Sequence, residues 1–142
     1  MNRQQNNSMQ NATIRLVIFG SVWLLIGSFV VAAALLDGTK FKVKVVPDQA
    51  SANKGAKEFE DELIFADGKF TSTTLLRIGF KPTKYFAESE PNEAEFEVEL
   101  RSATNGVATW TGEVRGTNAL GGLQWLQTNG TNFVYEFTGA KQ

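Results

Sequence analysis

The sequence predicts an all-β fold, an antiparallel up-and-down meander of about eight short strands that closes into a small barrel, preceded by an N-terminal apolar helix. Three observations support this prediction. From Phe41 onward apolar and polar residues alternate with a period of two. Turn signals divide the chain at short intervals. A long uncharged apolar run stands before the first predicted strand.

The apolar run extends from Leu16 to Leu36, 21 residues without a charge, and about 20 apolar residues can cross a bilayer. One interpretation is a cleavable secretory signal, with Ala32-Ala33-Ala34 as the small residues of the peptidase site. The other is an uncleaved transmembrane anchor, because a signal's apolar region usually has only about 7–15 residues. The short spacer before the first strand favours cleavage after Ala34. We therefore expect a signal peptide or membrane anchor over residues 1–34.

Residues 35–142 are then an exported, periplasmic or extracellular domain, of a size that suits one core. All 15 acidic residues but only 12 of the 14 basic residues lie in it, so its net charge is −3. That charge argues against a nucleic-acid partner, which requires a basic footprint. The chain contains no cysteine, so the domain relies on its core without disulfides.

One-sided alternation is typical of antiparallel strands with one buried face. The predicted strands are residues 41–46, 58–66, 69–77, 84–89, 94–102, 107–115, 120–127 and 132–139. Asp67-Gly68 predicts a tight hairpin. Residues 48–57 predict a short helical turn or a loop over a barrel mouth, and no other helix is suggested. Closure into a barrel would remove the exposed edges of such a meander.

Several segments resemble a group of small exported bacterial proteins of lipocalin-like (calycin-type) β-barrel character, most of them uncharacterised. The resemblance implies this fold for residues 36–140 and brings no catalytic residues with it. The segments that carry it are residues 36–43 (LDGTKFKV), 59–70 (FEDELIFADGKF), 109–116 (TWTGEVRG), 122–125 (GLQW) and 135–139 (YEFTG).

The absence of histidine and cysteine excludes Ser-His-Asp and Cys-His catalysis and the usual zinc and haem ligands. Only hard ions such as calcium would suit the carboxylates, and Asp61, Glu62 and Asp67 lack the spacing of a calcium loop. No metal or cofactor is predicted. Glu88 with Glu90, and the acids of 95–99, are candidates for carboxylate catalysis, but a solvated strand face explains them better.

A barrel of eight strands is filled by side chains or holds one small ligand. Large residues predicted to point inward argue for a filled core: Phe41, Phe59, Phe65, Phe96, Trp110, Phe133, Tyr135 and Phe137. Polar or small residues on the same faces argue for a pocket, and an unpaired buried Asp61 would be costly. Asp61 is therefore expected to pair, to lie at a mouth or to face a polar ligand. The candidate ligand-binding residues in the barrel are Asp61, Ser72, Thr74, Trp110, Trp125 and Tyr135.

The sequence thus predicts a non-enzymatic exported barrel at the cell envelope that binds a small apolar or amphipathic ligand. The alternative is a structural or protein-interaction module with a filled core, whose partner is another envelope protein. Contact with the membrane is expected only through the N-terminal apolar segment.

Overall fold

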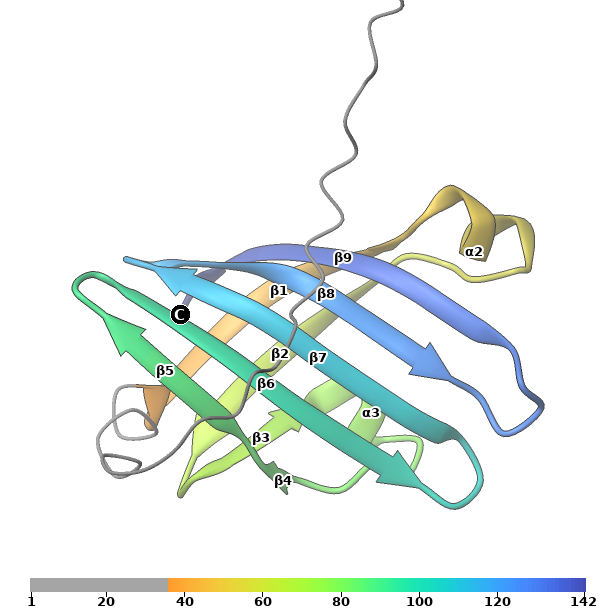
Figure 1. Ribbon diagram of the computed structural model, residues 1–142, viewed down its shortest axis with the longest axis horizontal. Coiled ribbons are helices and arrows are strands. Elements are labelled where there is room, and N and C mark those ends of the chain that lie inside the picture. The colour runs from red at the N-terminus through yellow and green to blue at the C-terminus, as the bar shows by residue number, and fades with distance from the viewer. Residues whose placement is uncertain (1–35) are drawn as a thin grey trace, which may run out of the picture.

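The computed structural model describes residues 36–142, which form an antiparallel meander closed almost completely into a barrel (Figure 1). The predicted all-β class is confirmed. Two short helices accompany the sheet, α2 (Gln49–Asn53) and α3 (Thr73–Leu76). The described residues contain nine strands: β1 (Thr39–Pro47), β2 (Phe59–Ala66), β3 (Lys69–Ser72), β4 (Thr83–Lys84), β5 (Phe86–Glu90), β6 (Glu93–Ser102), β7 (Gly106–Arg115), β8 (Asn118–Leu126) and β9 (Asn132–Lys141).

The barrel closes through β1, which pairs with β2 on one side and with the last strand, β9, on the other. The sheet order is β4-β3-β2-β1-β9-β8-β7-β6-β5, so β4 and β5 are its two edges. These edges follow one another in the chain and are joined by Tyr85 alone. The barrel is therefore open along a seam between β4 and β5.

The strand prediction needs two corrections. The strand predicted over 69–77 ends at Ser72, because the Ser72 hydroxyl accepts a 3.2 Å hydrogen bond from the N–H of Leu75 and begins α3. The expectation of no helix beyond 48–57 is accordingly wrong. The strand predicted over 84–89 is divided at Tyr85, because its first residues pair with β3 and its last with β6.

The hairpin register defines two ends of the barrel. The entry end carries the first described residues and the turns at 67–68, 91–92 and 116–117. The loop end carries α2, α3, the loop 77–82 and the turns at 103–105 and 127–131. The predicted Asp67-Gly68 hairpin is confirmed, with positive φ angles of 53° and 72° at its two residues.

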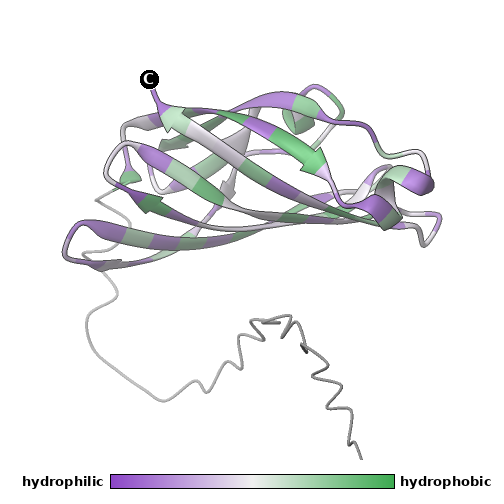
Figure 2. Cartoon of the chain, turned by 90° about the horizontal axis from the view of Figure 1, so that it is seen from above, coloured by the Kyte–Doolittle hydropathy of each residue, from purple (hydrophilic) through white to green (hydrophobic). Residues whose placement is uncertain are grey.

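The core occupies the inside of the barrel. Hydrophobic and hydrophilic residues alternate along many of the strands (Figure 2), as expected where one face of a strand is buried. Of the eight large residues predicted inside, six are at most 4% exposed. Phe59 and Phe133 are only partly buried and pack against the rim of the core. The six buried residues are Phe41, Phe65, Phe96, Trp110, Tyr135 and Phe137.

The predicted N-terminal apolar helix and the leader 1–34 lie outside the described residues. Leu36, the last residue of the apolar run, is described and is a core residue with 3% exposure. Within residues 36–142 no helix has both the length and the apolar character needed to cross a bilayer.

Candidate functional site

Asp61, Ser72 and Thr74, three of the predicted ligand-binding residues, lie together where β2 and β3 meet α3. Asp61 and Ser72 are 4% and 1% exposed, and the Ser72 hydroxyl donates a hydrogen bond to Asp61 Oδ2. The backbone N–H groups of Thr74 and Glu62 donate to Asp61 Oδ1 over 2.9 and 2.8 Å. The carboxylate is thus paired, one of the three outcomes that the sequence left open for it.

Burial raises the pKa of the Asp61 carboxyl above its ordinary value, and its hydrogen bonds to Ser72, Thr74 and Glu62 act in the opposite direction. The four hydrogen bonds of the Asp61 and Ser72 side chains all lie at the junction of β2, β3 and α3. The trio therefore fixes where β3 turns into α3. A ligand would have to compete with these protein contacts.

Trp110 and Tyr135, two further predicted residues, lie among aromatic rings inside the barrel. Trp110 is fully buried, with its ring 5.7 Å from Phe70 and 5.3 Å from Phe137. Tyr135 is 3% exposed and stands edge-on to Phe59 at 5.6 Å. The Trp110 indole N–H is buried without a hydrogen-bond partner among the described residues. Both side chains contribute to the packed core.

The surroundings of Gly112 show how tightly the core is filled. A Cβ added to it would lie 2.7 Å from a ring atom of Phe137 and 2.8 Å from Phe96, closer than such contacts normally allow. Phe96 in turn packs against Phe65 and Phe70, with centroids 5.0 and 6.0 Å away. At this level of the barrel, aromatic side chains take up the space that a ligand would need.

Trp125, the sixth predicted residue, lies at the loop end. Its indole N–H donates a 2.7 Å hydrogen bond to the carbonyl of Asn105, and its ring stands edge-on to Phe80 at 5.9 Å. Phe80 is 1% exposed and plugs this mouth from the loop 77–82. A hollow of about 160 Å³ remains on the outer side, lined by Thr104, Asn105, Trp125, Gln127, Thr128 and Asn129. It is smaller than the roughly 300–1,000 Å³ of ordinary small-molecule pockets.

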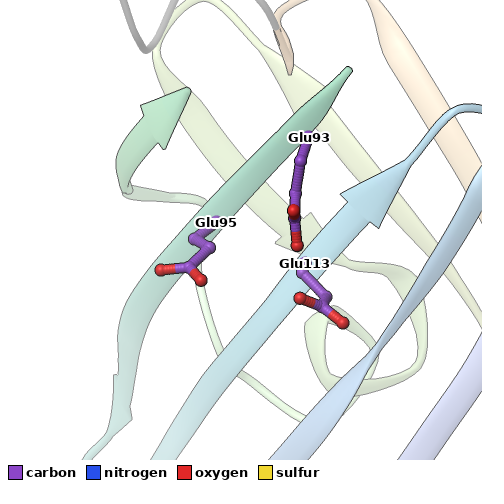
Figure 3. Close-up of side chains that lie close together, drawn as sticks. All are labelled: Glu93, Glu95 and Glu113. Carbon is purple, nitrogen blue, oxygen red and sulfur yellow. The ribbon is translucent and has the colours of Figure 1, made fainter. Parts of the chain in front are cut away.

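A different group of residues gathers on the outer face of β6 and β7. Glu93 and Glu95 project from β6 beside Glu113 of β7 (Figure 3), and each offers a carboxylate oxygen within 4.8 Å of the others. Oxygen ligands in this arrangement suit a hard cation such as Ca²⁺. Arg115 already neutralises part of the group, since it bonds Glu93 at 3.1 Å and Glu113 at 3.0 Å.

Glu93 and Glu113 also interact with each other. Their hydrogen bond raises the pKa of Glu113 and lowers that of Glu93, and Arg115 further lowers the pKa of Glu93. Sequence reasoning had placed Glu88, Glu90 and the acids of 95–99 on strand faces, but it missed this cluster. The cross-strand register that sets Glu95 opposite Glu113 was the missing information.

Glu88 and Glu90 extend the acidic face onto the edge strand. They lie opposite Glu95 and Glu93 in the ladder of β5 and β6, and the four carboxylates line a shallow surface hollow of about 40 Å³. A space of this size holds little more than a water molecule. The acidic face is therefore a charged surface rather than a pocket.

Comparison with known proteins gives no match: no protein-family model fits this chain, and no curated protein or solved structure is significantly similar to it. The nearly closed antiparallel barrel is compatible with a lipocalin-like fold.

Proposed function

We propose that this chain is an exported, non-enzymatic barrel of lipocalin-like type that acts at the cell envelope as a protein-interaction module. The observation that carries this proposal is the filled interior. The ring contacts around Trp110 and the lack of room for a Cβ at Gly112 favour the alternative that the sequence offered, a filled barrel, over a ligand inside it. A barrel with a packed core acts through its outer face, its edges or its loops.

The placement at the envelope rests on the uncharged run from Leu16 to Leu36. Cleavage after Ala34 would leave Leu35 as the first residue of the mature chain. Leu36 is already part of the barrel core, so a bilayer-spanning segment would have to end before it. This favours a cleaved signal over an anchor that includes the whole run.

The proposal that the protein is not an enzyme rests on the chemistry of its side chains. The chain lacks histidine and cysteine, and the carboxylate pair that the sequence offered as a catalytic candidate is Glu88 with Glu90. Both are exposed on a strand face, where water screens them and no enclosed space surrounds them. Replacing both by Gln should therefore leave any hydrolytic activity found in preparations of the protein unchanged.

Native mass spectrometry of the protein purified from its own envelope tests the proposal. We expect the mass of the chain cleaved after Ala34, alone or in a stoichiometric complex with another protein, and without a bound small molecule. A stoichiometric small molecule in the native spectrum would refute the filled-barrel proposal and support the barrel ligand that the sequence also predicts.

A titration with an apolar fluorescent dye provides the second arm of this test. The wild-type protein should show no saturable binding, since its interior is packed. Phe137→Ala removes a ring that contacts Trp110 and Phe96 and opens a cavity in the core. This variant is the positive control, because it should bind the dye if the assay can detect an internal site. Equal saturable binding by both proteins would contradict the proposal.

A further inference from the structure

Among residues 36–142, strand β5 has a partner on one side only. It pairs over its whole length with β6, from Phe86 opposite Glu97 to Glu90 opposite Glu93, and it ends the sheet. The other edge strand, β4, pairs only with Lys69 and Phe70 of β3. In Figure 1, β5 runs beside β6 toward the turn that joins them at the entry end. Its free edge is an open template for another strand.

The register identifies which backbone groups of β5 are unpaired. A two-residue turn joins Glu90 to Glu93, so this pair is hydrogen-bonded. Bonded and non-bonded pairs alternate along an antiparallel ladder, so the backbone of Glu88 also points to β6. The N–H and C=O groups of Ala87 and Ser89 then face the free edge. Within residues 36–142 these groups form no backbone hydrogen bond on that side.

The side chains beside this edge have a distinct character. Phe86 is 59% exposed, more than any other large apolar side chain in the described residues. Glu88 and Glu90 follow it at every second position, on the same outer face, and neither forms an ion pair within the described chain. Glu95 and Glu97 flank them from β6. The edge thus combines one apolar contact with an uncompensated row of negative charge.

This charge selects against a second copy of the same edge. In an antiparallel pair of two β5 strands, the glutamates of one copy would stand opposite or diagonal to those of the other, and like charges across a ladder are destabilising. Charged side chains on edge strands commonly prevent such self-association. The same row favours a cationic strand, because opposite charges in cross-strand pairs stabilise a sheet.

We propose that the free edge of β5 binds an extended cationic segment of a partner protein by antiparallel strand addition. The segment would place Lys or Arg opposite Glu90 and Glu88 and an apolar residue opposite Phe86. Its backbone would bond to the N–H and C=O groups of Ala87 and Ser89. This inference rests on the proposed function, since it names the surface and the chemistry through which the interaction module acts.

The test uses a synthetic peptide, Thr-Lys-Thr-Lys-Thr-Leu-Thr, and the isotope-labelled protein purified from the envelope. On addition of the peptide we expect amide shifts concentrated at residues 86–90 and slower hydrogen exchange at Ala87 and Ser89. A peptide with Glu in place of Lys should not bind. A Lys peptide whose backbone amides are methylated keeps its charge, and it should bind at least about ten-fold more weakly because it cannot complete the ladder.

Two protein variants complete the test. Ser89→Pro removes an N–H that the fold itself does not use, at an edge position where proline is tolerated, and should weaken peptide binding about ten-fold. Glu88→Gln with Glu90→Gln keeps the backbone edge and should weaken binding while reducing its salt dependence. Glu58→Gln is the charge control, because Glu58 lies just before β2 and pairs with Lys44 of β1, and neither of these strands pairs with β5. It should leave peptide binding unchanged.

Shifts spread over the whole acidic face, without protection of Ala87 and Ser89, would show charge attraction alone and overturn the proposal. Equal binding of the methylated peptide would do the same. A different result would contradict the proposed function itself, the filled barrel. A small molecule inside the barrel would appear in the native spectrum and would shift the Trp110 indole resonance, whatever the peptide does at β5.

Discussion

The Tyr85 hydroxyl donates a 2.7 Å hydrogen bond to Oδ1 of Asp37 and so connects the seam of the barrel with the residues just before β1. The Asp37 carboxylate also accepts from the N–H of Gly68, at 3.0 and 3.2 Å to its two oxygens. Burial raises the pKa of Tyr85, and the Asp37 carboxylate raises it further. The hydroxyl therefore keeps its proton. These bonds hold together three segments that meet at the entry end.

Tyr85→Phe removes this hydroxyl while keeping the buried ring. We expect the free energy of unfolding to fall by about 1–2 kcal/mol, because a hydrogen bond to a carboxylate is lost and, among residues 36–142, the Gly68 N–H is the donor that Asp37 keeps. Urea denaturation of the two proteins measures the difference. Tyr135→Phe is the matched control. Burial alone raises the pKa of Tyr135, so no carboxylate acts on its hydroxyl. Its removal should lower the free energy of unfolding by less. Equal losses would show that the contact with Asp37 contributes nothing.

Gly112→Ala tests whether the barrel interior is full. The added methyl group would meet rings of Phe137 and Phe96 within 2.8 Å, so we expect a loss of about 1–3 kcal/mol in the free energy of unfolding from overpacking. Gly122→Ala is the control on the neighbouring strand. Its Cβ would lie 3.5 Å from the Tyr135 carbonyl oxygen, an ordinary contact, and should change stability by less than about 0.5 kcal/mol. Similar values for both variants would indicate empty space beside Gly112.

Alternation in the sequence predicted most of the fold because the long strands each have one buried face. The positions of Phe41, Phe96, Trp110 and Phe137 inside the barrel follow from this pattern. The break after Ser72 could not be predicted in the same way. Thr73 and Thr74 are β-branched and favour strands, whereas the helical turn depends on hydrogen bonds that Ser72 and Thr74 donate to Asp61 on the preceding strand.

The candidate site was less predictable, because it depends on which residues face each other across strands. The need of a buried Asp61 for a partner could be predicted from the sequence. That Ser72 is this partner follows only from the pairing of β2 with β3. The sequence could not place Trp125 at a mouth already plugged by Phe80, since the loop 77–82 has no periodic pattern. The cluster of Glu93, Glu95 and Glu113 likewise requires the register of β6 and β7.

Asp61 should make the stability of the barrel depend on pH. Its pKa is raised in the folded protein above the ordinary value of 3.8, so the folded state binds this proton more tightly than the unfolded state. The resulting stabilisation is fully present below the unfolded-state pKa and is lost as the pH rises through the folded-state pKa.

Asp61→Asn removes this titration, and its amide can still donate to the Ser72 oxygen while its carbonyl accepts from the backbone. We therefore expect the free energy of unfolding of the wild type, minus that of the variant, to be larger near pH 3 than near pH 7. Urea denaturation across this range measures it, and the other titrating groups cancel in the difference. A constant difference, or one that grows with pH, would contradict the raised pKa.

Leu36 links the predicted processing of the chain to the stability of the barrel. Its side chain is 3% exposed within the core cluster, and its carbonyl accepts a hydrogen bond from the Thr39 hydroxyl. Cleavage after Ala34 preserves these contacts, whereas a cut after Leu36 would remove them. The intact mass of the mature protein should therefore place its first residue before Leu36.

Leu36→Ala should lower the free energy of unfolding by about 2–3 kcal/mol, because it leaves a cavity in the core. Leu126→Ala is the control, since Leu126 is 49% exposed and its truncation should cost less than about 0.5 kcal/mol. Urea denaturation of both variants in the mature form measures the two costs. If they are equal, or if the mature chain begins after Leu36, then Leu36 is not part of the barrel core and the short spacer no longer argues for cleavage after Ala34.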